Sequence, residues 1–313
     1  MTQIAGIIAP VFGVMAAGYV AARLGLLTAG IARRLVLFVF NVAIPLMLFY
    51  RIATVEFPDE IAWSFLVGYY ASAFISYALG VLAARYGFHR SLDEQSIHGL
   101  AAGFSNTVLL GIPLLASAFG EAATVPTFLI ISFHSATLLP VSILMIQMGR
   151  VRRGESAAGS WPSLLFGVLA NPIIAGILLG IGANLLGLAP LPGPIDAAAN
   201  LMGAAAIPCA LIALGASLAG YELRGQFAPA VVLASIKLLV QPVLAWAFVV
   251  HVLGLGAPWA PVAVVMAGMP SGAMVYLFGA RYETASEVAA SAVVLSSAAS
   301  VVTLSVLLVL MGA

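Results

Sequence analysis

One lysine, Lys237, lies in the middle of a long apolar stretch, VVLASIKLLVQPVLAWAFVV. A charge at the centre of a bilayer costs roughly 2.5–3.5 kcal/mol on insertion scales and usually faces a cavity or a partner. Gln241 follows four residues later, on the same helical face. Because no Asp or Glu lies in the middle of any apolar stretch, a bound carboxylate is one candidate counter-ion. The alternative is that Lys237 bonds backbone carbonyls and only stabilises the helices.

Two other apolar stretches, residues 96–118 and 258–280, are interrupted at their middles by Gly, Pro and small polar residues. The interrupting residues are Gly103, Ser105, Asn106, Thr107, Gly111 and Pro113 in the first, and Gly268, Pro270, Ser271 and Gly272 in the second. Proline removes a backbone donor, and glycine tolerates unwound backbone. We therefore predict two broken helices, whose exposed N–H ends attract anions. The alternative is a plain proline kink in each helix.

These residues also limit the ions to which a transport reaction could be coupled. A sodium site would have to use the oxygens of Ser105, Asn106, Thr107 and Ser271, with freed carbonyls. A proton path could use Lys237, or His134 within the stretch 124–148. A lone buried histidine is also commonly a packing residue. We expect no metal centre and no cofactor, because paired Cys motifs, HExxH and phosphate-binding loops are absent from the sequence.

A third pair of positions carries the same tripeptide, Ala-Ile-Pro, which ends at Pro45 and at Pro208. Asn41 lies one turn before Pro45 and faces roughly the same way. We expect both prolines, with Gly103, Gly111 and Gly272, to act at hinges or crossovers, and Asn41 to be a candidate for ion coupling. The alternative is that the two prolines only bend supporting helices.

The composition indicates that the solvent of these elements is lipid. Hydrophobic residues make up 63% of the 313 residues and charged residues 7%, against roughly 45–50% and about 25% in soluble domains. The first apolar stretch is too rich in Gly and too poor in basic residues for a cleaved signal. A net charge of +1 argues against nucleic acid as a partner, and the single cysteine excludes an intramolecular disulfide.

Ten stretches are long and apolar enough to span a bilayer, which takes about 20 residues. They cover residues 3–22, 31–50, 60–84, 96–118, 124–148, 162–186, 196–219, 228–252, 258–280 and 286–311.

The sequence also repeats: Pro10 and Gly18 match Pro172 and Gly180 at an offset of 162. Two copies with an odd number of spans must be inverted relative to each other, as in secondary transporters. We predict repeats at 1–150 and 162–313, joined by a cytoplasmic linker at 151–161.

Positive charge predicts the orientation in the membrane. Ten of the twelve Lys and Arg residues lie in or beside the loops that follow the odd-numbered spans. Basic loops stay in the cytoplasm, so both termini are expected outside, in a multi-pass protein of the plasma membrane (the inner membrane of a bacterium).

Six motifs together resemble the auxin efflux carrier family, which includes plant auxin exporters and bacterial malonate-type carriers. They are NVAIPLMLFY, GFSNTVLLGIPLL, ANPIIAGILLGI, AIPCALIALGASL, KLLVQP and AGMPSGAMVYLFGARY, and they extend over nearly the whole chain. The resemblance implies an all-α membrane protein with ten helices in two inverted five-helix repeats, a scaffold domain, and a mobile transport domain. It also implies that the broken fourth and ninth helices cross, with Asn106 and Pro113 at one crossover and Pro270 and Ser271 at the other.

The resemblance implies transport of organic anions by an elevator-like movement. The linker is too short for the regulatory loop of plant members, and the scaffold lacks their intramembrane acid, so a small carboxylate is the expected substrate rather than auxin. We predict a secondary carrier, coupled to Na⁺ or H⁺ or working by exchange, with Asn106, Thr107, Pro113, Pro270, Ser271, Lys237 and Gln241 at the substrate site. A homodimer in the lipid is a further expectation.

Four alternatives stay open. A carrier related to bile-acid/sodium symporters or to sodium/proton antiporters would have the same broken helices, and a channel or a receptor could use the same fold. An intramembrane serine hydrolase is disfavoured, because Ser217 and His251 fall near opposite ends of their spans and a Ser–His pair must lie within hydrogen-bond reach. We therefore do not expect an enzyme.

Overall fold

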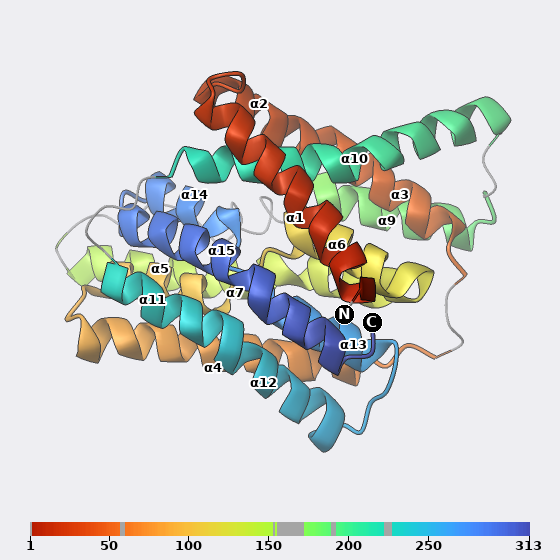
Figure 1. Ribbon diagram of the computed structural model, residues 1–313. Coiled ribbons are helices and arrows are strands. Elements are labelled where there is room, and N and C mark those ends of the chain that lie inside the picture. Colours follow the sequence, from red (N-terminus) through yellow and green to blue (C-terminus); the bar gives the residue numbers. More distant parts are fainter. Residues whose placement is uncertain (1, 57–59, 153, 155–171, 189–191, 222–226) are drawn as a thin grey trace.

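The computed structural model describes residues 2–56, 60–152, 154, 172–188, 192–221 and 227–313. All regular elements in these ranges are helical (Figure 1). The helices of the first half are α1 (Thr2–Arg23), α2 (Ala29–Phe38), α3 (Ile44–Thr54), α4 (Ser64–Leu82), α5 (Leu92–Gly103), α6 (Ile112–Phe119) and α7 (Thr124–Arg152). Those of the second half are α9 (Pro172–Leu185), α10 (Gly193–Ala219), α11 (Phe227–Ser235), α12 (Gln241–Trp246), α13 (Trp259–Ala267), α14 (Ala273–Arg281) and α15 (Ser286–Leu310).

Several of these helices join through π-helical turns that precede a proline. The turns Val39–Ala43, Thr107–Gly111 and Ile236–Val240 each end two residues before Pro45, Pro113 or Pro242. A proline has no N–H to donate, and its ring clashes with the carbonyl four residues earlier, so the preceding turn widens. α2 and α3 therefore form one continuous rod, and α11 and α12 form another that ends in a further π-helical turn at Val252.

Seven of the helical stretches in the described residues are long and apolar enough to cross a membrane. The count differs from the ten predicted spans for three reasons. α5, α13 and α14 are too short on their own, because both interrupted segments break. The stretch Thr107–Arg152 joins α6 and α7 without a long loop. Residues 162–171, at the start of the predicted sixth span, and most of the predicted linker lie outside the described residues. The protein is a multi-pass, all-helical membrane protein.

The helices gather into two groups (Figure 1). α1 packs against α10, and α3 packs against α9 and α10. The second group holds α4, α5 and α7, with α11 to α15 beside them. Each group therefore mixes helices from both halves of the sequence.

Glycines let the helices of the first group approach closely. A Cβ added at Gly18 would collide with the backbone of Ile212, and one added at Gly180 would collide with the backbone of Phe49. Gly18 and Gly180 are related by the offset of 162, and Phe49 and Ile212 by one of 163. The first helix of each half thus meets the second helix of the other half through equivalent residues.

Candidate functional site

The two interrupted segments meet in the interior of the second group. The chain leaves helical geometry between Gly103 and Thr107 and again between Ala267 and Ala273. The Asn106 N–H donates to the Pro270 carbonyl at 2.8 Å, and the Gly272 N–H donates to the Phe104 carbonyl at 2.9 Å. These two bonds flank an antiparallel bridge between Ser105 and Ser271, which we call the crossover. The predicted interruptions are therefore present, and they lie against each other.

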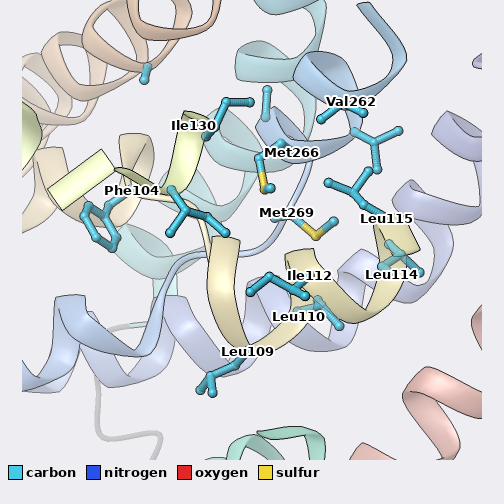
Figure 2. Close-up of a cluster of buried hydrophobic side chains, with 14 of the residues drawn as sticks. Phe104, Leu109, Leu110, Ile112, Leu114, Leu115, Ile130, Val262, Met266 and Met269 are labelled. Atoms are coloured by element: carbon cyan, nitrogen blue, oxygen red, sulfur yellow. The ribbon is translucent and has the colours of Figure 1, made fainter. Parts of the chain in front are cut away.

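Apolar side chains enclose the crossover. Phe104, Leu109, Leu110 and Ile112 from the first interrupted segment are buried in this region, as are Met266 and Met269 from the second (Figure 2). Two glycines make this close packing possible. A Cβ on Gly111 would meet the Met266 sulfur at 2.8 Å, and one on Gly272 would meet the Phe104 ring at 2.9 Å. Pro270 therefore lies where the second helix is interrupted, and Gly111 and Gly272 allow the two interrupted segments to pack closely.

Two side chains from neighbouring helices accept the N–H groups that the crossover serines leave free. The Ser105 N–H donates to His134 Nε2 on α7 at 3.0 Å, and the Ser271 N–H donates to Ser296 Oγ on α15 at 3.0 Å. His134 and Ser296 are separated by 162 residues, the offset of the repeat. In an interior without water each of these donors needs a partner, so both side chains have the same local role.

Two other side chains cap carbonyls at the ends of the broken helices. Ser271 Oγ donates to the Ala101 carbonyl in the last turn of α5 at 2.6 Å, and Lys237 Nζ donates to the Ala267 carbonyl at the end of α13 at 2.5 Å. Ala101 and Ala267 are 166 residues apart, as are Ser105 and Ser271. Lys237 is fully buried, and a cation at a helix C-terminus is stabilised by the helix dipole. The partner of Lys237 in this structure is thus backbone.

Several buried polar atoms around these elements have no hydrogen-bond partner within the described chain. They are Asn106 Nδ2, His134 Nδ1 and both amide atoms of Gln241. Because His134 Nε2 accepts the Ser105 N–H, its neutral ring carries the proton on Nδ1. Asn106 Nδ2 and His134 Nδ1 are therefore donors without acceptors. An unpaired buried donor costs about 1–3 kcal/mol, which a ligand oxygen would offset.

The electrostatics of the crossover favour an anion. The half-helix that follows Asn106 and the helix α14 both begin here, and neither has a side-chain cap on its first N–H groups. The N-terminal end of a helix carries partial positive charge. In the described part of the chain, no three His, Cys, Asp or Glu residues gather in a way that could hold a metal ion. The crossover can therefore bind a ligand through hydrogen bonds from backbone N–H groups and side-chain amides.

The structure brings most of the predicted site residues together and separates three of them. Ser105, Asn106, Thr107, Pro270, Ser271 and Gly272 form or flank the crossover; Lys237, Gln241, His134, Gly103, Gly111 and Pro113 lie on elements in contact with it. Asn41, Pro45 and Pro208 lie in the other group of helices. The Asn41 amide is exposed and donates to the Leu37 carbonyl of its own helix at 2.8 Å.

Two residues that bond to the crossover serines were not predicted from the sequence. The Tyr69 hydroxyl on α4 donates to Ser105 Oγ at 3.3 Å, and Ser296 accepts the Ser271 N–H. The repeat could have indicated Ser296, because it occupies the position that His134 has in the first half. No sequence pattern indicates Tyr69, since tyrosine is common in apolar helices.

Two interrupted helices that cross inside a bundle of apolar membrane helices are typical of membrane transporters. The sequence model of the membrane transport protein family matches residues 4–160 and 159–308. The chain belongs to this family, which is the auxin efflux carrier family that its motifs resembled.

Three relatives extend this result. The chain is 26% identical, over 99% of its length and 96% of the other, to a protein of Rhizobium meliloti (strain 1021) named "Putative malonate transporter". It is 29% identical, over 92% and 91%, to an "Uncharacterized transporter" of Methanothermobacter thermautotrophicus. It is 25% identical to the "Lysosomal cholesterol signaling protein" of Mus musculus, over 74% of this chain and 28% of that protein. The protein is a membrane transporter with a small-molecule substrate.

Proposed function

We propose that the protein is a secondary carrier of small organic anions, carboxylates above all, and that the crossover is its substrate site. The observation that carries the proposal is the meeting of two uncapped helix N-termini beside Asn106 and His134, whose side-chain donors have no partner in the described chain. A carboxylate supplies both the negative charge and the acceptors that these groups lack. The name of the Rhizobium relative agrees with this substrate class.

The proposed site has donors of two kinds. Asn106, Thr107 and Ser271 offer side-chain and backbone groups at the crossover itself, while Pro113 and Pro270 keep the helices broken there. Lys237 already donates to the Ala267 carbonyl, and an ammonium group has two further N–H donors. It would hold the end of α13 and add positive charge. Gln241, one turn further on, would reach the same substrate.

The proposed movement is elevator-like alternating access. The first group of helices would serve as the scaffold and the second, with the crossover, as the transport domain. The equivalent contacts of Gly18 and Gly180 across the two halves support two inverted five-helix repeats, 1–150 and 162–313, and so ten spans. Coupling to Na⁺ or H⁺, or obligatory exchange, would drive the movement. We further propose a plasma-membrane location with both termini outside, and a homodimer.

The substitution Asn106→Ala tests the site. The variant loses one donor to the carboxylate, and a hydrogen bond to a charged group contributes about 1.5–3 kcal/mol, so uptake of malonate into proteoliposomes should fall roughly tenfold or more. Asn41→Ala is the matched control, because Asn41 bonds only its own helix carbonyl, and it should retain uptake. Both variants should unfold at the temperature of the wild type. Wild-type uptake by Asn106→Ala would refute the site.

Counterflow distinguishes a carrier from the other uses of this fold. Proteoliposomes loaded with unlabelled malonate should accumulate labelled malonate against its gradient, since a carrier exchanges one substrate for another. A channel would let the label equilibrate without accumulation, and a receptor would neither exchange nor leak. Repeating the experiment with and without Na⁺, and at several pH values, separates the two modes of coupling.

A further inference from the structure

A second polar site lies at the far end of α5 from the crossover. A cavity of about 300 Å³ opens between the start of α5 and the start of α15, lined by Arg90, Glu94, His98, Ala285, Ser286, Glu287 and Val288. α5 is 12 residues long, so at 1.5 Å per residue its start lies roughly 18 Å from its end beside the crossover, and His98 lies about halfway along it. The proposed substrate site does not use any of these residues.

The wall at the start of α5 carries three ionisable side chains. Glu94 and His98 are four residues apart and lie one above the other on the same face of α5, and Arg90 lies just before the N-cap residue Ser91. Arg90 Nη1 lies 3.5 Å from Glu94 Oε1. Glu94 Oε2 accepts from the N–H and the hydroxyl of Ser91, closing a capping box at the N-terminus of α5. The Glu94 charge is therefore already compensated.

The opposite wall is the N-terminus of α15, a helix of 25 residues that has no side-chain cap. Its N-cap residue is Ala285, whose methyl group accepts no hydrogen bond. The contrast with the capped start of α5 shows what the first N–H groups of α15 lack: an acceptor with negative charge. Glu287 follows in the first turn, with its side chain exposed.

His98 supplies an independent observation. It is 1% exposed and lines the cavity. Its Nδ1 lies 2.8 Å from the Glu94 carbonyl, and because a carbonyl only accepts, Nδ1 carries the proton. In the neutral ring Nε2 is then an acceptor, and it has no partner in the described chain. One wall of the cavity thus needs a donor, and the other needs an acceptor.

Two other charged groups close to the cavity, Asp93 and Arg150, are engaged elsewhere. Asp93 Oδ2 accepts from the Thr284 hydroxyl at 3.1 Å. The Arg150 guanidinium donates to the Tyr282 carbonyl at 2.9 Å and lies against the Tyr282 ring. The groups that face the cavity are therefore Arg90, Glu94, His98 and Glu287, together with the α15 N-terminus.

We propose that this cavity binds a small oxyanion that carries a proton, of which hydrogen phosphate is the type. Its charged oxygens would accept from the first N–H groups of α15 and from Arg90, and its O–H would donate to His98 Nε2. A fully deprotonated anion of the same shape satisfies only one wall. The site therefore discriminates between phosphate and sulfate, which differ at neutral pH in that O–H.

The experiment measures binding of inorganic phosphate and of sulfate to the detergent-purified full chain at pH 7.5 and constant ionic strength, by isothermal titration calorimetry. Wild-type protein should bind phosphate about tenfold tighter than sulfate, the ratio that one hydrogen bond of roughly 1.4 kcal/mol gives. His98→Phe should remove this preference. Equal affinities for the two anions in the wild type, or no binding of phosphate, would overturn the proposal.

Variants of Ala285 keep the test valid should the buried His98→Phe variant fail to fold. Ala285 has a positive φ of 47°, a conformation that Asp and Gly adopt readily. Ala285→Asp sets a carboxylate beside the free N–H groups and should abolish phosphate binding, whereas Ala285→Gly adds no charge and should preserve it. Asn106→Ala should also preserve it, because the crossover is a separate site. Phosphate binding that survives Ala285→Asp, or that is lost in Asn106→Ala, would contradict a site at α15.

Discussion

Equivalent backbone groups at the crossover form hydrogen bonds with different side chains. His134 and Ser296 each accept a serine N–H, and Lys237 and Ser271 each donate to the carbonyl of an equivalent alanine. The repeat therefore fixes where backbone groups must be satisfied but not which side chain does so. In each pair one side chain is a serine and the other is a histidine or a lysine. The backbone of the crossover is therefore nearly symmetric, while its side chains are not.

The role of His134 as an acceptor predicts different outcomes for two substitutions. His134→Gln keeps an oxygen near the position of Nε2 and should retain most of the stability. His134→Phe leaves the buried Ser105 N–H unpaired and should lower the free energy of unfolding by about 1–3 kcal/mol. Chemical unfolding in detergent, followed by intrinsic fluorescence, measures the difference. If the two variants are equally stable, the bond to Ser105 contributes nothing.

At the scale of elements, glycines decide how closely the helices of the first group pack. Gly18 lies under the backbone of α10, while Gly176 and Gly180 lie under that of α3. A side chain at these positions would meet main-chain atoms, which move only with their whole helix. Other glycines on the same helices, Gly13 and Gly182, have open space around them. Gly13 on α1 and Gly182 on α9 are therefore control positions for substitutions at the closely packed glycines.

Gly180→Ala and Gly182→Ala should therefore change stability in opposite directions. Alanine stabilises a helix by roughly 0.5–1 kcal/mol relative to glycine, so Gly182→Ala should be neutral or stabilising. At Gly180 the methyl group forces α9 away from α3, and overpacking of this kind costs about 1–3 kcal/mol. Thermal unfolding of the purified variants compares them. A stabilised Gly180→Ala would mean that α9 and α3 are not in close contact in the membrane.

At the scale of the whole molecule, an ion pair between described residues links the two groups of helices. Arg51 Nη1 on α3 lies 3.1 Å from Glu121 Oε1, in the turn between α6 and α7. Both side chains are substantially exposed, and a pair of this kind contributes at most about 1 kcal/mol. It is strong enough to favour one arrangement of the groups and weak enough to break during a transport cycle.

Cross-linking at this pair tests whether the groups move relative to each other. With Cys209→Ala as background, Arg51→Cys and Glu121→Cys would be joined by a short bis-maleimide, which fixes α3 to the turn before α7. Elevator-like movement predicts that counterflow stops after cross-linking, while each single-cysteine variant treated in the same way still exchanges. Unchanged exchange in fully cross-linked protein would exclude a relative movement of these two elements.

The positions of the helix breaks could be predicted from the sequence because proline and glycine act locally. Pro270 and Gly272, two residues apart, disfavour a continuous helix, and Pro113 widens the turn before it. The apolar composition likewise determined that the helices lie in lipid. The repeat offset of 162 also relates His134 to Ser296, but the sequence analysis did not single out Ser296. These properties depend on single residues, on near neighbours or on the average over the chain.

The family resemblance implied that the two breaks cross, but only the tertiary structure decided which of their backbone groups meet. Ser105 bridges Ser271 from 166 residues away, and Lys237 bonds a carbonyl 30 residues further along the chain rather than an acidic partner. The structure also set Asn41 apart from the crossover, despite its place one turn before the tripeptide that both halves share. Such pairings arise from the packing of whole helices against one another, and no local pattern of residues specifies which distant backbone groups will meet.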